Sequence, residues 1–132
     1  MIEVKEIKDL QKVIDCIKKS GKNIVILSGT LGSGKTTLVK EFVKSLGVDD
    51  KVTSPTFAIQ NIYDNKVFHY DLYNKGLNEF LSLGMIEELE KEGYHFIEWG
   101  EELKDILDMY GFEYMVIKIS LEGDKRVFEC QG

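Results

Sequence analysis

One octapeptide constrains the fold more than any other stretch of this sequence: Gly29-Thr30-Leu31-Gly32-Ser33-Gly34-Lys35-Thr36. It fits the pattern G-x-x-x-x-G-K-[ST], in which a glycine-rich loop follows a strand and opens a helix. Both neighbours are present. The apolar run at residues 23–28 predicts a buried strand, and the helical spacing of apolar residues between 36 and 46 predicts a helix. We therefore interpret the octapeptide as a phosphate-binding loop (P-loop) rather than as a glycine-rich turn before an ordinary helix.

The residue types of this loop suit a polyphosphate ligand. The glycines let the backbone turn successive N–H groups toward a phosphate, and the helix N-terminus adds its partial positive charge. In such loops the lysine, here Lys35, reaches the β- and γ-phosphates, and the hydroxyl of Thr36 binds Mg²⁺. Every residue of the octapeptide is therefore a candidate for nucleotide binding: Gly29, Thr30, Leu31, Gly32, Ser33, Gly34, Lys35 and Thr36.

The composition predicts one domain that spans residues 1–132, with a hydrophobic content of 43%. No apolar run approaches the roughly 18 residues of a membrane span, and the first residues lack a signal-peptide core, so we expect a cytoplasmic protein. The net charge is −6, and no cluster of lysines and arginines suggests direct contact with nucleic acid. If RNA is involved, another subunit is expected to hold it. On its own, the chain is expected to be monomeric or to self-associate weakly.

Cysteine, histidine and arginine residues provide few candidates for chemistry. Cys16 and Cys130 are far apart in the sequence and are expected to be reduced, structural thiols. His69 and His95 lack metal-ligand spacing. The single arginine, Arg126, lies near the C-terminus, although phosphoryl-transfer enzymes often use an arginine to stabilise the transition state. Three explanations for having only one arginine stay open: a lysine stabilises the transition state instead, a partner supplies the cationic group, or intrinsic turnover is slow.

The remaining residues predict helices and strands arranged around the P-loop. We expect helices at residues 6–19, 77–83, 85–92 and 101–109, a buried strand at 94–99, and β-hairpins joining 57–63 to 66–73 and 113–121 to 125–130. The predicted fold class is α/β. It is a single-domain P-loop NTPase fold, with a central and mainly parallel sheet, antiparallel hairpins and flanking helices.

Two carboxylates end predicted strands. Asp71 closes the first hairpin, and Glu98 follows three consecutive apolar or aromatic residues, as in a Walker B motif. A carboxylate at the tip of a strand beside a P-loop holds Mg²⁺ or its water shell. The alternative for each is an ordinary solvated acid at the start of a turn or helix.

The loop at residues 47–56 contains three hydroxyl side chains, those of Thr53, Ser54 and Thr56. It leads from the end of the P-loop helix into the next strand. In P-loop proteins such a loop can sense the γ-phosphate, as switch I does. The equally simple alternative is a polar connector with a turn at Pro55.

Several stretches together resemble the TsaE (YjeE) family of ATPases, which takes part in making threonylcarbamoyladenosine in tRNA. The shared stretches are the P-loop extended to Thr37, Thr53-Ser54-Pro55-Thr56-Phe57, His69-Tyr70-Asp71-Leu72-Tyr73 and Ile97-Glu98-Trp99. Their order and spacing agree over nearly the whole chain. The P-loop alone is unspecific, whereas the other three stretches are specific in combination.

Three positions depart from the family pattern. Thr30 stands where the family usually has aspartate, Asn74 where it has arginine, and Gly100 where it has proline. The difference at Asn74 leaves open any role of that arginine in this chain.

The resemblance implies a cytoplasmic bacterial protein that binds ATP with Mg²⁺ and hydrolyses it weakly when alone. It also implies docking onto the TsaB–TsaD pair, which transfers the threonylcarbamoyl group to the adenosine beside the anticodon. Hydrolysis by this subunit would reset that complex rather than perform the transfer. The tRNA would be contacted only indirectly, through the complex.

These expectations combine into a site hypothesis with candidate catalytic residues Lys35, Asp71 and Glu98. Lys35 neutralises charge on the β- and γ-phosphates, and Thr36 and Glu98 hold Mg²⁺ directly or through water. Asp71 positions or activates the attacking water, or supports the metal shell. Two further threonines complete the set of nucleotide-binding residues: Thr37, on the α-phosphate side, and Thr56, which closes over the γ-phosphate with Thr53 and Ser54.

Two questions stay open. The sequence does not separate the roles of Asp71 and Glu98. It also does not define the adenine pocket, for which the start of the first helix and the turn at residues 122–125 are candidates.

Three other functions share some of these features. A small-molecule kinase has the same loop, but it normally needs a lid bearing arginines, and residues 74–93 contain none. A GTPase generally carries an asparagine-lysine-x-aspartate stretch, and neither Asn65-Lys66 nor Asn74-Lys75 is followed by that aspartate. A nucleotide-stabilised assembly module would need no turnover and would still support its partner without Asp71 or Glu98.

Overall fold

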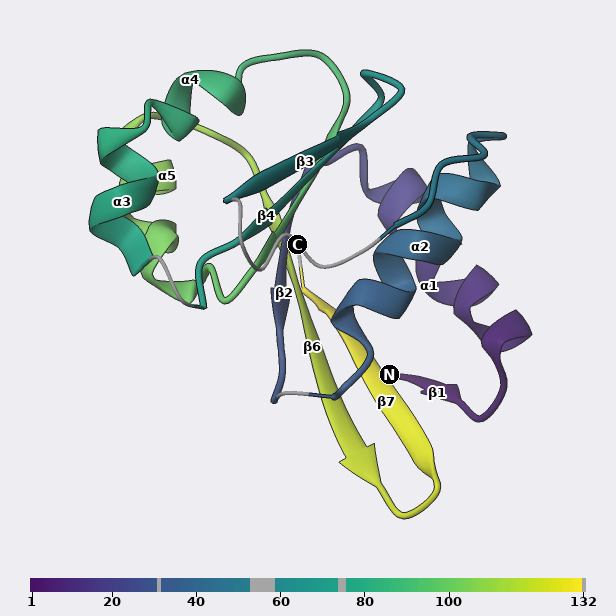
Figure 1. Cartoon of the computed structure of the whole chain (residues 1–132). Coiled ribbons are helices and arrows are strands. Elements are labelled where there is room, and N and C mark those ends of the chain that lie inside the picture. Colours follow the sequence, from purple (N-terminus) through teal and green to yellow (C-terminus); the bar gives the residue numbers. More distant parts are fainter. Residues whose placement is uncertain (31, 53–58, 74–75, 132) are drawn as a thin grey trace.

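A seven-stranded sheet forms the centre of the computed structural model, which describes residues 1–30, 32–52, 59–73 and 76–131 (Figure 1). The strands lie in the order β1-β7-β6-β2-β5-β4-β3. Their bounds are β1 Ile2–Val4, β2 Ile24–Ser28, β3 Gln60–Tyr63, β4 Val67–Asp71, β5 Tyr94–Glu98, β6 Met115–Glu122 and β7 Lys125–Gln131. The helices are α1 Leu10–Ser20, α2 Lys35–Ser45, α3 Gly76–Ser82, α4 Met85–Glu88 and α5 Lys104–Met109, with 3₁₀ turns η1 Ile7–Asp9 and η2 Glu101–Leu103.

The four inner strands β6, β2, β5 and β4 are mutually parallel, and antiparallel strands flank them on both sides. Strand β2 lies in the middle, and residues 24–27 are buried because helices cover both faces of the sheet. This arrangement confirms the predicted α/β class with a mainly parallel centre and antiparallel hairpins.

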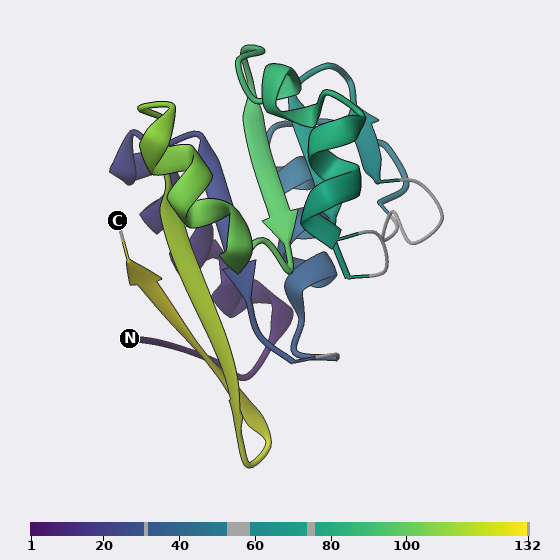
Figure 2. The same ribbon diagram turned by 90° about the vertical axis from the view of Figure 1, so that its left-hand side faces the viewer.

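Helices cover the two faces of the sheet separately. Figures 1 and 2 show α1 and α2 on one face and α3, α4 and α5 on the other. Helix α1 buries Leu10, Val13, Ile14 and Ile17, which recur at helical spacing and pack into the core on that face. A second cluster on the opposite face contains Phe80 of α3. The P-loop helix α2 packs beside α1 on the same face of the sheet.

Several element boundaries differ from the sequence-based prediction. The helix predicted at 101–109, for example, divides into the 3₁₀ turn η2 and α5. The helix predicted at 6–19 begins with the 3₁₀ turn η1, and α1 starts only at Leu10. The helix predicted at 85–92 ends at Glu88 and continues as turns. Strand β1 was not predicted, because three residues are too few to show alternation. It forms only by pairing with β7, more than a hundred residues away in sequence, with Val4 opposite Arg126.

The first hairpin turns at the expected Asp64 and Asn65, but its loop has three residues, 64–66, because Tyr63 pairs with Val67. Asp64 and Asn65 both adopt positive φ, 51° and 52°, as a type I′ turn requires.

On the far side of the sheet, Cys16 of α1 and Cys130 of β7 are free thiols. Burial, with a contribution from Cys16, raises the pKa of the Cys130 thiol to about 12, so it stays protonated at neutral pH. Every helix in the described ranges is too short or too polar to cross a bilayer.

Candidate active site

The topology gathers the candidate residues at one edge of the sheet. Strands β2, β5 and β4 are parallel neighbours, so their carboxyl ends lie together. The P-loop follows β2, whereas Glu98 ends β5 and Asp71 ends β4. In the sheet register, Glu98 pairs with Leu27 on one side and with Asp71 on the other. Ligands of open α/β sheets bind at this edge.

Close contacts explain the glycines of the loop. Gly34 has φ +109°, a conformation that side chains rarely adopt, and it caps the N-terminus of α2. A Cβ atom there would also lie 3.3 Å from the Arg126 side chain. At Gly29 a Cβ atom would lie 2.7 Å from Ser33 Oγ. Larger residues at these positions would open the loop.

Lys35 lies inside the site, with 5% of its surface exposed. Its Nζ donates to the carbonyl oxygen of Gly29 at 2.5 Å and lies 3.5 Å from the centre of the Trp99 ring, a cation–π contact. Burial lowers the pKa of the Lys35 amine, and the carboxylate of Glu98 is the largest of the influences that oppose this shift. The ammonium group is therefore held close to the loop by uncharged partners that a phosphate can replace.

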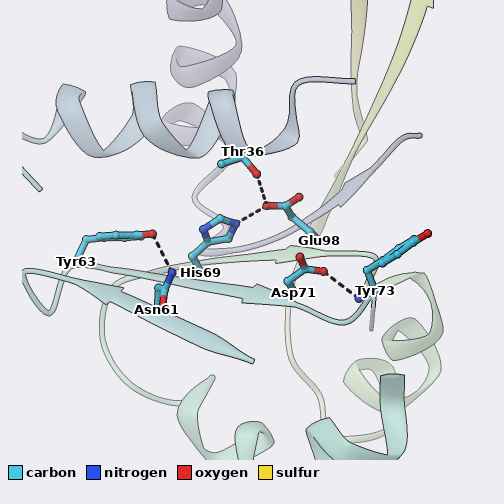
Figure 3. Close-up of polar contacts among 7 residues, drawn as sticks. All are labelled: Thr36, Asn61, Tyr63, His69, Asp71, Tyr73 and Glu98. Atoms are coloured by element: carbon cyan, nitrogen blue, oxygen red, sulfur yellow. Dashed lines mark hydrogen bonds and ion pairs between the residues drawn. The ribbon is translucent and has the colours of Figure 1, made fainter. Parts of the chain in front are cut away.

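Glu98, at the end of β5, connects the P-loop helix α2 to strand β4 (Figure 3). Thr36 Oγ1 donates to Glu98 Oε2 at 3.0 Å, and Nε2 of His69, on β4, bonds the same oxygen. Both Glu98 and His69 are buried. The Nδ1 atom of His69 has no hydrogen-bond partner among the described residues. The carboxylate is thus fixed beside the N-terminus of α2.

Asp71 has different surroundings from Glu98. Its Oδ1 accepts a hydrogen bond from the backbone N–H of Tyr73 at 2.9 Å, which holds the turn after β4 (Figure 3). The side chain is buried, which argues against the alternative of a fully solvated acid. The two carboxylates are therefore neighbours in the sheet, and Glu98 bonds the P-loop helix through Thr36.

Most of the candidate nucleotide-binding residues line one hollow of about 320 Å³. Its walls are Gly32, Ser33, Gly34, Lys35, Thr36, Thr37, Glu98, Trp99 and Arg126. Gly29 and Thr30 line an adjacent hollow that shares Trp99. Leu31 and Thr56, together with Thr53, Ser54 and Asn74, lie outside the described residues.

Arg126 is a site residue that the sequence analysis missed. From β7 its Nε donates to the carbonyl of Ser33 at 2.8 Å, and its Nη2 donates to that of Gly32 at 3.3 Å. None of the three explanations left open for the scarcity of arginine anticipated that the single one reaches the P-loop. The contact spans 93 residues of sequence, and no local pattern signals it.

His69 was also missed as a site residue. A signal for it did exist, since residues two apart on a strand point to the same face. His69 therefore shares its face of β4 with Asp71, and a prediction of one as a site residue could have included the other.

Trp99 turns the chain immediately after Glu98 and adopts φ +60°, a conformation unusual for a bulky residue. Its ring also packs against that of Tyr73, with 4.9 Å between centroids. The next residue, Gly100, has φ −102°, and a Cβ atom there would lie 2.5 Å from Ile97 Cγ2. The close approach of Ile97 explains the glycine at position 100, and φ −102° does not suit a proline, which requires φ near −65°.

Comparison with known proteins gives the family of this chain. The family model described as "Threonylcarbamoyl adenosine biosynthesis protein TsaE" matches residues 3–128. The chain belongs to the TsaE family. A TsaE protein of Bacillus subtilis is 32% identical over 126 residues, which cover 93% of this chain and 77% of that protein. A TsaE protein of Borreliella burgdorferi is 37% identical over 114 residues, covering 83% and 81%.

A solved structure supports the fold. The crystal structure of Bacillus subtilis YdiB matches with a TM-score of 0.65 and 22% identity, and it covers 98% of this chain and 82% of that one. Both TsaE relatives are named as tRNA threonylcarbamoyladenosine biosynthesis proteins. Membership of the TsaE family assigns this chain to that pathway of tRNA modification.

Proposed function

We propose that this chain is a Mg²⁺-dependent ATPase that assists a TsaB–TsaD pair in forming threonylcarbamoyladenosine in tRNA. The observation that supports this most is the meeting of Lys35, Thr36 and Glu98 in one hollow beside the P-loop. Family membership supports the pathway, and the P-loop supports a nucleoside triphosphate as ligand.

The chain's own groups would hold the triphosphate. Backbone N–H groups of the loop and the N-terminus of α2 attract phosphate oxygens. Lys35 exchanges its contacts with Gly29 and Trp99 for the β- and γ-phosphates, which are stronger partners for an ammonium group than a carbonyl or a ring. Ser33 Oγ is buried and has no hydrogen-bond partner among the described residues. A phosphate oxygen bound in the loop could accept a hydrogen bond from this hydroxyl group.

The donor set fits Mg²⁺, which prefers oxygen ligands and commonly takes one or two from the protein, with water and substrate phosphates supplying the rest. Thr36 Oγ1 and Glu98 Oε2 are such a pair, 3.0 Å apart. When bound, the ion neutralises charge that develops on the phosphates. His69 keeps the Glu98 carboxylate in place. The backbone N–H of Tyr73 fixes the Asp71 carboxylate. In this mechanism the fixed carboxylate orients the attacking water.

Adding a TsaB–TsaD pair is expected to raise ATP hydrolysis by the purified chain by at least about tenfold, toward the roughly 10³–10⁵-fold that a partner's arginine contributes in other P-loop enzymes. The reason is that Arg126 is already engaged with the carbonyls of Gly32 and Ser33, which leaves a need for further cationic groups. Phosphate release measured with and without the pair provides the test.

Two controls sharpen this test. Stimulation should disappear in Lys35→Ala, and GTP should be a poorer substrate than ATP. Unchanged turnover in the presence of the pair would contradict the proposal. A screen for phosphate transfer to small acceptors would then examine the kinase alternative.

ATP is also expected to change the intrinsic fluorescence of the chain in a saturable manner. Trp99 is the only tryptophan, and the Lys35 ammonium that lies over its ring should move away when phosphates bind. In Lys35→Ala the emission should differ from the start and should respond little to ATP. An unaltered response in that variant would mean that Lys35 does not couple Trp99 to the ligand.

A further inference from the structure

Arg126 extends from β7 and contacts three consecutive residues of the P-loop. Its Nε donates to the carbonyl oxygen of Ser33 at 2.8 Å, and its Nη2 donates to that of Gly32 at 3.3 Å. The stem of the side chain lies against Gly34, where a Cβ atom would be 3.3 Å from Arg126 Cδ. The planar guanidinium is thus a rigid fork that joins two neighbouring peptide groups of the loop.

These two bonds set the direction of the peptide groups. In a planar trans peptide, the C=O and the N–H that follows it point in opposite directions. Because the carbonyls of Gly32 and Ser33 point toward Arg126, the N–H groups of Ser33 and Gly34 are turned away from it. The N–H of Ser33 also donates to the carbonyl oxygen of Thr30 at 3.1 Å, which closes the turn of the loop. The N–H groups of a P-loop are the ones that bind phosphate.

We infer that Arg126 is a positioning residue, which holds the P-loop in its phosphate-binding shape through the carbonyls of Gly32 and Ser33. This inference rests on the proposed function. The arginine acts on the ligand through the loop, by aiming the loop's N–H groups and by polarising their peptide groups. Since these N–H groups bind phosphate before and during hydrolysis alike, Arg126 contributes to binding rather than to the chemical step.

Strands on both sides fix the backbone of Arg126. It lies opposite Leu121 of β6 and opposite Val4 of β1. The unpredicted strand β1 thereby gives β7 a second partner at the position from which the side chain reaches the loop. The loop is held in shape before any ligand arrives, and such preorganisation lowers the entropy cost of binding. Because the Arg126 side chain is exposed, its replacement should not unfold the chain.

Calorimetric titration with ATP and with inorganic tripolyphosphate tests the role in binding. Arg126→Ala should weaken both ligands by the same factor, about threefold to tenfold, because both bind the N–H groups of the loop. Arg126→Lys keeps the charge but cannot form the fork, so it should lose nearly as much. Lys125→Ala removes the same charge from the next residue of β7. That side chain points to the other face of the strand and pairs with Glu3, so neither affinity should change.

Steady-state kinetics separates positioning from catalysis. Arg126→Ala should raise the KM for ATP by about threefold to tenfold and leave kcat within about twofold, as expected when binding shared by the ground and transition states is lost. A fall in kcat of about a hundredfold at unchanged KM would identify a catalytic arginine and overturn the inference.

The single arginine also provides a spectroscopic signature. In nitrogen-labelled protein its Nε–H signal should change little when tripolyphosphate binds, because the bonds to the loop carbonyls persist. The amide signals of Ser33 and Gly34 should shift in ligand-free Arg126→Ala and stay in place in Lys125→Ala. A large change of the Nε–H signal on binding would mean that Arg126 leaves the carbonyls for the phosphates, which contradicts the inference.

The binding results also distinguish this inference from the proposed function. If the unaltered chain binds neither ligand, the proposed function fails and the inference fails with it. If it binds both, and Arg126→Ala binds them equally well, only the inference is wrong. Full recovery in Arg126→Lys would show that the charge matters and the fork does not. A loss confined to ATP would mean that Arg126 contacts the nucleoside instead of holding the loop, and either result would overturn the inference.

Discussion

Replacing Lys35 with alanine is expected to weaken ATP binding by about tenfold to a hundredfold and to slow hydrolysis by a further factor of about 10²–10³. The binding loss corresponds to removal of a charge-assisted hydrogen bond to phosphate. The loss in rate is larger because charge builds up on the phosphoryl oxygens in the transition state, where a fixed ammonium group contributes most. Calorimetric titration and phosphate-release assays measure the two effects separately.

A matched control lies on the same helix. Lys40→Ala removes the same charge from an exposed position of α2, outside the hollow, and should leave both quantities within about twofold. Equal effects of the two substitutions would indicate that only the overall charge of α2 matters. Normal binding and turnover in Lys35→Ala would remove the P-loop from the proposed function altogether.

The elements that carry the P-loop could be predicted from sequence because their signals are local. The apolar run of β2, the glycines and the apolar face of α2 follow one another within residues 24–45, and each constrains only its own backbone. The hairpins were equally predictable, because the turn at Asp64 and Asn65 depends on two residues with positive φ.

Local sequence patterns could not predict the contacts that depend on the order of strands in the sheet. Thr36 meets Glu98 across 62 residues because β5 lies beside β2. Arg126 meets Ser33 because β7, antiparallel to β6, begins at the edge of the sheet where the P-loop lies. Glu98 could still be proposed from its position at the tip of an apolar strand. Arg126 could not, since arginine side chains are usually exposed to solvent. Strand β1 was hidden for a related reason, because its pairing partner is at the other end of the chain.

Sequence alone placed Glu98 at Mg²⁺ and Asp71 at the attacking water or the metal shell without separating the two roles, and the structure gives the two acids different partners. Glu98 is tied to Thr36 and His69, whereas the Asp71 carboxylate bonds the backbone of Tyr73. This difference supports a division of roles in the proposed mechanism, with Glu98 on the metal side and Asp71 on the side of the attacking water. It also makes the two roles separable by experiment.

Glu98→Gln is therefore expected to lower turnover by about 10²–10³-fold and to raise the Mg²⁺ concentration needed for half-maximal activity. The substitution keeps the size of the side chain and an oxygen that can accept from Thr36, so the fold should be retained and the unfolding temperature should change little. What is lost is the negative charge. Asp71→Asn should lower turnover to a similar degree without changing the Mg²⁺ requirement, because it acts on the water and not on the ion.

Titration of activity with Mg²⁺, alongside calorimetric binding of ATP with and without Mg²⁺, distinguishes the two acids. Glu102→Gln removes a charge from an exposed position of η2, four residues further along the chain, and should behave as the unchanged protein does. If Asp71→Asn alters the Mg²⁺ requirement and Glu98→Gln does not, the two roles are reversed. If both variants turn over ATP normally, neither acid takes part in hydrolysis, and the contact between Thr36 and Glu98 serves only to position α2 against β5.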